Sequence, residues 1–286
     1  MLLFGTAGIT AQAKEQSTEG GIKRAKEIEL GCMEIEFVQG VRMGEEKAKK
    51  VRETALSEGI GLTVHAPYFI NLSSKEPEKV KASIQRILDS ARIGAMAGAR
   101  SVTFHPAYYG EKSAQEVYKD VKNALLDITS ILRSENIKIY IRPETTGKPS
   151  QFGTLEEIVL LSQEVSGILP CVDFSHLYAR SGGKRNSYDE FIKILELIEK
   201  ELGSPRPSPQ SGNTALQNMH IHTSGIAYGL KGEKHHTIFE ESEFNYKALL
   251  KALKDKKAGG FLICESPNPG LEDDALLLKK IYNALH

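Results

Sequence analysis

Histidine, aspartate and glutamate residues end a series of short apolar runs in this sequence, as in TVHAP, TFHPA and VDFSH. Imidazole and carboxylate groups together suit zinc, manganese or iron(II), whereas magnesium and calcium prefer oxygen ligands alone. These groups outnumber the three or four ligands of one ion, so two or three ions are expected. Ions about 3.5–4 Å apart are typical of phosphoester cleavage. The residues concerned are His65, His105, Glu144, Asp173, His176, His220, His222, His235, His236 and Glu265.

Eight apolar runs rich in Val, Ile and Phe must position these residues, and amphipathic stretches separate them. Such runs are typical of strands covered on both faces. Eight strand–helix units in alternation predict a single (β/α)8 TIM barrel over residues 1–286, in preference to a doubly wound open sheet. The expected strands are 2–8, 32–38, 61–67, 101–107, 138–144, 168–176, 218–224 and 260–266.

A barrel of this kind brings the carboxyl ends of all its strands to one rim, where the active site lies. The candidate ligands should therefore meet at that rim. The polar segment 225–243 follows the seventh strand and should lie on the same face. The Pro/Ser-rich stretch 204–214 precedes that strand and is expected to be a connector on the opposite face. No glycine-rich fingerprint follows the first strand, which argues against dinucleotide binding.

The composition sets limits on partners and compartment. Lys+Arg and Asp+Glu both number 37, so the net charge is zero. The overall composition therefore lacks the excess of basic residues that is typical of nucleic-acid-binding proteins. Cys32, Cys171 and Cys264 lie in apolar runs and are expected to be buried thiols without disulfides. The sequence has no membrane-length apolar run and no convincing signal peptide. We expect a cytoplasmic monomer with no membrane partner.

Several motifs, in order along nearly the whole chain, resemble the endonuclease IV family of apurinic/apyrimidinic endonucleases, a branch of the xylose-isomerase-like barrels. The combination of the first motif with the Glu-Thr-Thr-Gly segment and the Asp-x-x-His pair is the most specific part. The motifs are HAPYFINL (65–72), HP (105–106), PETTGKPSQFGT (143–154), VDFSH (172–176), MHIH (219–222), EKHH (233–236) and CESPNP (264–269).

The resemblance implies three zinc ions, although manganese and iron(II) accept the same ligands. Glu144 is shared by the first two ions, and Glu144 and Glu265 also lie beside the attacking hydroxide. His222 shares the strand face of His220 and is expected beside the ligands, and His236 is not assigned. The implied ligands are His65, His105 and Glu144 for the first ion, Glu144, Asp173, His220 and Glu265 for the second, and His176, Glu233 and His235 for the third.

The implied reaction is hydrolysis of double-stranded DNA on the 5′ side of an abasic site, which leaves a 3′-hydroxyl. A zinc-bound water with a pKa near 7 supplies the nucleophile. Tyr68 and Phe69 match the loop that enters the minor groove at the lesion, and Arg42 matches the arginine that fills the gap in the base stack. Glu233 stands where the family has an aspartate, and the segment 237–242 is bulkier and more acidic than its glycine-rich counterpart.

Two other functions fit the residues. A sugar isomerase or epimerase of the related barrels would need a single metal, for which Glu144, Asp173, His220 and Glu265 suffice. A non-catalytic module that binds nucleic acid or stores metal would need the ligands without turnover. The number of metal ions per chain separates the first two possibilities.

Overall fold

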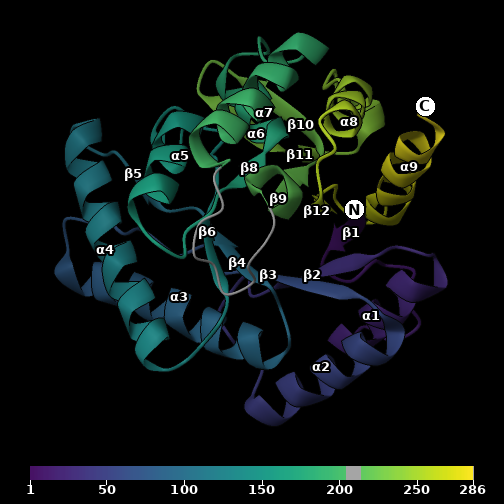
Figure 1. Ribbon diagram of the computed structural model, residues 1–286, viewed down its shortest axis with the longest axis horizontal. Coiled ribbons are helices and arrows are strands. Elements are labelled where there is room, and N and C mark those ends of the chain that lie inside the picture. The colour runs from purple at the N-terminus through teal and green to yellow at the C-terminus, as the bar shows by residue number, and fades with distance from the viewer. Residues whose placement is uncertain (204–213, 286) are drawn as a thin grey trace.

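Eight parallel strands form the barrel that the sequence predicts, and all eight expected strands are present (Figure 1). They follow the order β6-β4-β3-β2-β1-β12-β9-β8. Parallel bridges from Ile141 to Ile168 and from Glu144 to Cys171 join the two ends of this sheet. The strands are β1 Leu2–Ala7, β2 Cys32–Glu36, β3 Gly61–His65, β4 Ser101–Phe104, β6 Tyr140–Pro143, β8 Cys171–Asp173, β9 Met219–Thr223 and β12 Gly260–Cys264.

The structure is a computed structural model that describes residues 1–203 and 214–285. The connector predicted at 204–214 lies outside these ranges except for Thr214. Within them, no helix has the length and apolar character needed to cross a membrane.

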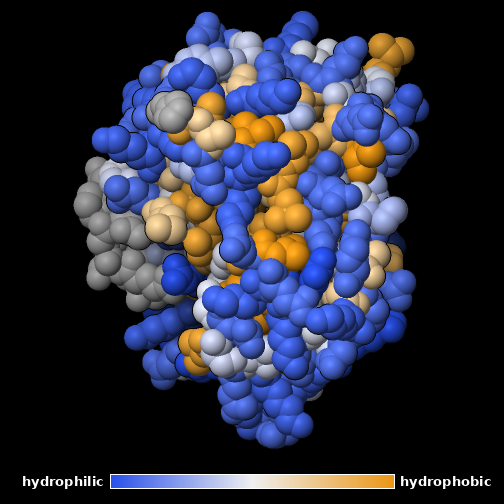
Figure 2. All heavy atoms as spheres, turned by 90° about the vertical axis from the view of Figure 1, so that its right-hand side faces the viewer, coloured by the Kyte–Doolittle hydropathy of each residue, from blue (hydrophilic) through white to orange (hydrophobic). Residues whose placement is uncertain are grey.

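Helices surround the barrel and turn their apolar sides towards the strands. Ser113 and Thr154 begin two of them with capping boxes, in which Glu116 and Glu157 bond back to the cap. Seen from the side that carries the chain ends, the surface is mostly hydrophilic, with a band of apolar residues across its middle (Figure 2). The helices are α1 Thr18–Glu27, α2 Glu45–Glu58, α3 Pro77–Met96, α4 Ala114–Ser134, α5 Leu155–Glu164, α6 Phe174–Arg180, α7 Tyr188–Leu202, α8 Tyr246–Asp255 and α9 Leu271–Ala284.

Two small sheets lie outside the barrel. β5 (Ala107–Tyr108) pairs with β7 (Gln151–Phe152), and β10 (Gly225–Gly229) forms an antiparallel hairpin with β11 (Gly232–Thr237). The hairpin follows β9, so the segment after the seventh barrel strand does belong to the carboxyl-end face.

The barrel interior changes character along its axis. A small apolar cluster of Cys32, Phe261 and Ile263 fills part of it. Phe261 and Ile263 pair in register with His220 and His222, so these histidines also face inwards. Cys32, Cys171 and Cys264 are all buried free thiols, as predicted. The part of the interior near the carboxyl ends of the strands is therefore polar, although branched apolar side chains usually fill barrels of this type.

Gly5 on β1 packs closely against β2, and its replacement should destabilise the barrel. A Cβ atom there would lie 2.2 Å from the carbonyl oxygen of Cys32. We expect Gly5→Ser to lower the free energy of unfolding by about 1–3 kcal/mol, as overpacking does. Gly44→Ser is the matched control, because a Cβ atom at Gly44 meets nothing within 4 Å and serine begins helices well. Equal urea midpoints for the two variants would contradict this view of β1.

Candidate metal centre

Several buried polar atoms make no hydrogen bond within the described residues, and four of them belong to one group at the carboxyl end of the barrel: Glu144 Oε1, Asp173 Oδ2, His222 Nδ1 and Glu265 Oε2. Each of the four residues offers a ligand atom within 4.8 Å of the others. His222 Nδ1 lies 3.4 Å from Glu144 Oε1 and 3.2 Å from Glu265 Oε1. Buried polar atoms are normally paired, and three buried carboxylates repel one another. A divalent cation would satisfy all four atoms, so the residues present fit a metal ion.

A second group uses the other oxygen of Glu144. His65 Nε2 lies 3.3 Å and His105 Nε2 lies 3.5 Å from Glu144 Oε2. These three residues also place their ligand atoms within 4.8 Å of one another. Glu144 therefore lies between two groups, as the sequence analysis expected of a bridging carboxylate.

A third group combines Asp173, His176 and His236. His176 Nε2 lies 3.2 Å from His236 Nε2 and 3.5 Å from Glu233 Oε2. Gly147 permits this approach, since a Cβ atom there would lie 2.6 Å from Glu233 Oε2. The glutamate side chain thus reaches His176 beside the third group, and its role as a ligand stays a prediction.

The structure corrects the choice of histidine in the third group, because His235 is exposed and His236 faces His176. The cause is a bulge in the hairpin. His236 pairs with Ile226 and Glu233 pairs with Tyr228, with a register shift between them. Ile226 and Tyr228 are two residues apart on one strand and share a face, so Glu233 and His236 share one too.

The structure places the two histidines on β9 at different depths in the barrel. Nδ1 of His222 faces the carboxylates, whereas His220 lies two residues deeper in the barrel and contacts Glu34 and Ser101. Burial lowers the pKa of His220 to about 4. His222 is therefore the candidate ligand of the central group, whereas His220 forms another group of possible ligands with Cys171 and His222 deeper in the barrel.

Backbone carbonyls orient three of the candidate histidine ligands. The Nδ1 atoms of His65, His176 and His236 lie 2.7, 3.0 and 3.3 Å from the carbonyl oxygens of Ala66, Thr145 and Glu265, respectively. A carbonyl can only accept a hydrogen bond, so each Nδ1 carries the proton. The Nε2 lone pairs are then free to bind a metal, as is usual for histidine ligands.

Two glutamates on β2 escaped the sequence analysis. Glu34 is fully buried in the barrel, and Glu36 lines the cleft above it. Burial, reinforced by the nearby charges of Glu34 and Glu265, raises the pKa of Glu36 to about 8. Their signal was visible in CMEIEFV, since acids at alternate positions of an otherwise apolar strand must face the same side.

The candidate ligands open into a cleft of about 520 Å³. Tyr68 lines it, and Tyr68 and the neighbouring Phe69 are 55% and 65% exposed. Tyr108, which the sequence analysis did not select, is another exposed aromatic residue of the lining. Three aromatic side chains therefore surround or adjoin the mouth of the cleft.

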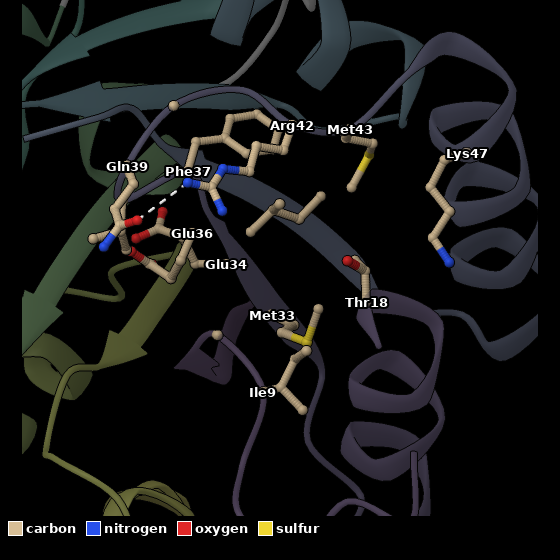
Figure 3. Close-up of a pocket in the computed structure, with 14 residues that line it drawn as sticks. Ile9, Thr18, Met33, Glu34, Glu36, Phe37, Gln39, Arg42, Met43 and Lys47 are labelled. Atoms are coloured by element: carbon tan, nitrogen blue, oxygen red, sulfur yellow. Dashed lines mark hydrogen bonds between the residues drawn. The ribbon is translucent and has the colours of Figure 1, made fainter. Parts of the chain in front are cut away.

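Arg42 lies in a neighbouring cavity of about 510 Å³, shown in Figure 3. Its Nη2 donates to Gln39 Oε1 at 3.2 Å. Glu36 and Val38 line both cavities, so they separate Arg42 from the metal cleft. Arg42 is thus on the same face as the cleft but does not touch the candidate ligands.

The model of the family described as xylose isomerase-like TIM barrel matches residues 22–281. An uncharacterized protein of Methanocaldococcus jannaschii is 46% identical over 285 residues, which cover 100% of this chain and 98% of that protein. A probable endonuclease 4 of Mycoplasma pneumoniae is 24% identical over 185 residues, which cover 63% of this chain and 59% of that protein.

Two solved structures share the fold. Endonuclease IV from Thermus thermophilus superposes with a TM-score of 0.71 at 16% identity and covers 99% of this chain and 100% of its own. A D-tagatose 3-epimerase-like protein also gives a TM-score of 0.71, at 18% identity, and covers 97% of both chains. At these identities the likeness establishes the fold alone.

Replacing His236 by alanine should remove one bound metal ion, whereas His235→Ala should leave the metal content unchanged. The two residues are adjacent, so the pair controls for general damage to the hairpin. Elemental analysis of protein purified without chelator gives the ions per chain. Loss of metal from His235→Ala alone would overturn the assignment.

Metal affinity should increase with pH because protons compete for the ligands. Although burial opposes it, the hydrogen bond to Glu144 and the charge of Glu36 raise the pKa of His65 to about 10. Metal binding near neutral pH must therefore displace a proton from the metal-free protein, and affinity should rise from about pH 6 to about pH 9. Chelator-competition titrations with zinc test this, and an affinity that falls over this range would contradict it. The His65→Asn variant should release fewer protons on zinc binding than the original protein does.

Proposed function

Because the chain belongs to the xylose isomerase-like TIM barrel family, we propose that it is a metal-dependent hydrolase that cleaves DNA beside abasic sites. The resemblance to endonuclease IV seen in the sequence is supported by relatives that carry the name probable endonuclease 4. The observation that carries the proposal is the presence of three groups of ligand atoms joined by shared carboxylates. Glu144 belongs to two of the groups, and Asp173 also belongs to two.

The number of candidate ligands favours phosphodiester hydrolysis over single-metal chemistry. His65 and His105 lie on one side of Glu144, and His176 and His236 lie beside Asp173. A single-metal site would use neither histidine pair. Divalent ions bound there, with zinc as the proposed metal, would polarise the scissile phosphodiester and make a water molecule more acidic.

Glu265 is suited to hold the attacking water. Although burial opposes it, the adjacent His222 lowers the pKa of Glu265 to about 2. The carboxylate is therefore ionised at neutral pH and can accept a hydrogen bond from water. Its Oε2 atom has no hydrogen-bond partner among the described residues, so it is available for this role. Glu144 would contribute a ligand to each of two ions, because it belongs to two of the groups.

The proposed substrate is double-stranded DNA with an abasic site. Exposed aromatic side chains beside a cleft can enter the minor groove and unstack a base step, which is easiest where a base is missing. Tyr68 stacks edge-on against His65, with ring centroids 5.7 Å apart, so a wedge at this position would place the lesion beside the metal centre. Arg42 would contact DNA further along the same face.

A sugar epimerase with one metal is the second candidate. The likeness to a D-tagatose 3-epimerase-like structure favours it, and Glu144, Asp173, His222 and Glu265 would form its site. The sequence suggests His220 as the histidine of this single-metal site, whereas the geometry places His222 there.

Incision of a duplex that carries one abasic analogue tests the proposal. We expect zinc-dependent incision that stops with chelator and falls about 100-fold to 10,000-fold in Glu265→Gln, the range for loss of a group that handles a proton. Glu240→Gln, at an exposed glutamate, is the matched control and should stay active.

Tyr68→Ala should weaken binding of abasic DNA more than binding of intact DNA, measured by fluorescence anisotropy at fixed salt. Absence of incision by the zinc-loaded protein, together with epimerisation of free ketohexoses, would replace the first candidate by the second.

A further inference from the structure

His222 is oriented differently from the other candidate histidine ligands. Three of those are held by backbone carbonyls at Nδ1 and present Nε2, whereas His222 presents Nδ1 to the carboxylates of the central group. Its Nε2 lies 2.9 Å from Glu34 Oε1. A carboxylate side chain thus takes the place that a carbonyl occupies elsewhere in the site.

Glu34 contacts two imidazoles at once. Its Oε2 lies 2.9 Å from His220 Nε2, and the two Nε2 atoms of His220 and His222 are 3.2 Å apart. Thr63 Oγ1 also donates to Oε2, at 2.7 Å. All four side chains are fully buried. Each oxygen of the carboxylate therefore lies 2.9 Å from the Nε2 atom of one imidazole, and the two rings are inclined to each other by 79°.

The distances place Glu34 as a hydrogen-bond acceptor for both rings, since each of its oxygens lies 2.9 Å from one histidine Nε2. Thr63 Oγ1 donates to the same carboxylate, so Glu34 receives hydrogen bonds in this network. With Glu34 as the acceptor, His220 and His222 both carry a proton on Nε2. Ser101 Oγ, 3.1 Å from His220 Nδ1, donates to that nitrogen. The same arrangement leaves the Nδ1 lone pair of His222 directed at Glu144 and Glu265.

The opposite tautomer of His222 would be useless for metal binding. Glu144 and Glu265 lie within 3.4 Å of Nδ1 and would themselves attract a proton there. A proton on Nδ1 would occupy the lone pair that a metal needs. Carboxylates lie on both sides of the ring, Glu34 at Nε2 and Glu144 and Glu265 at Nδ1, so the position of the ring proton decides whether His222 can be a ligand.

We propose that Glu34, assisted by His220, is a positioning residue that keeps the proton of His222 on Nε2 and so prepares Nδ1 for the central metal ion. This inference rests on the proposed metal-binding role of His222. A fully buried carboxylate is costly unless it is paired, and branched apolar side chains usually fill this part of a barrel. Departures from such packing are expected where function requires them.

Glu34→Gln tests the proposal, with Thr63→Val as the matched control. The glutamine keeps the size of the side chain but removes the charge, whereas the valine removes one hydrogen bond to Glu34 and leaves both imidazoles untouched. Zinc affinity, measured by chelator competition, should fall about 10–100-fold in Glu34→Gln, as for other partners of histidine ligands. Thr63→Val should stay within a few-fold of the original protein. Circular dichroism of the metal-free variants controls for folding.

Long-range ¹H–¹⁵N NMR of the histidine rings gives a readout that a purely structural role would not move. The zinc-loaded protein should show a strongly hydrogen-bonded proton on His222 Nε2, and this signal should shift in Glu34→Gln. A proton on Nδ1 of His222, or unchanged zinc affinity in Glu34→Gln, would overturn the proposal. So would an extra ion bound by Glu34, His220, His222 and Cys171, with no proton on either Nε2.

The outcome is separable from that of the proposed function. If Glu34→Gln weakens zinc binding but no variant cleaves abasic DNA, the positioning role stands and the hydrolase proposal fails. If abasic DNA is cleaved and zinc affinity is the same in Glu34→Gln, the hydrolase proposal stands and the positioning role fails.

Discussion

Electrostatic repulsion among buried carboxylates is the constraint on which the carboxyl end of this barrel depends. Glu144 and Asp173 are fully buried, and Glu265 lies beside them with His222 between. Burial raises the pKa of Asp173 to about 6, which expresses the cost of a further negative charge in this place. Imidazoles at the edges of the group offset part of the cost. The unpaired oxygen atoms that remain point to a cation as the missing partner.

The architecture makes this concentration of charge possible. Parallel strands end at one rim, so residues more than a hundred positions apart meet without any long loop. Glu144 follows β6 and Glu265 follows β12, yet both approach the same nitrogen of His222 on β9. The apolar cluster of Cys32, Phe261 and Ile263 fills the interior next to this polar layer. The rigid strands, rather than the connecting loops, fix the central group.

Much of this arrangement could be predicted from the sequence because it follows from strand periodicity. All eight strands were found, although they are shorter than expected: β8, for example, is Cys171–Asp173 where the expected strand was 168–176. The position of Glu144 between two groups and the approach of Glu233 to His176 also follow from the sequence. Each of these features depends on the strand that a residue follows, and the apolar runs of the sequence identify that strand directly.

The choice between neighbouring histidines could not be predicted, because it depends on how deep a residue lies in the barrel and on a bulge in the hairpin. His220 and His222 share a face, so alternation alone could not tell which of them reaches the rim. His236 replaces His235 because of a bulge, and nothing in the letters GEKHHT marks one. Glu34 was overlooked because a buried acid inside a barrel contradicts the usual apolar pattern.

The hairpin bulge selects the histidine that the third group receives. A one-residue slip in a regular strand turns every side chain to the opposite face. In β11 the bulge sets Glu233 and His236 on one face, three residues apart. In a regular strand of the same sequence, Glu233 would instead share a face with His235, two residues away. Both arrangements supply one glutamate and one histidine, so the bulge decides which of two adjacent histidines faces His176.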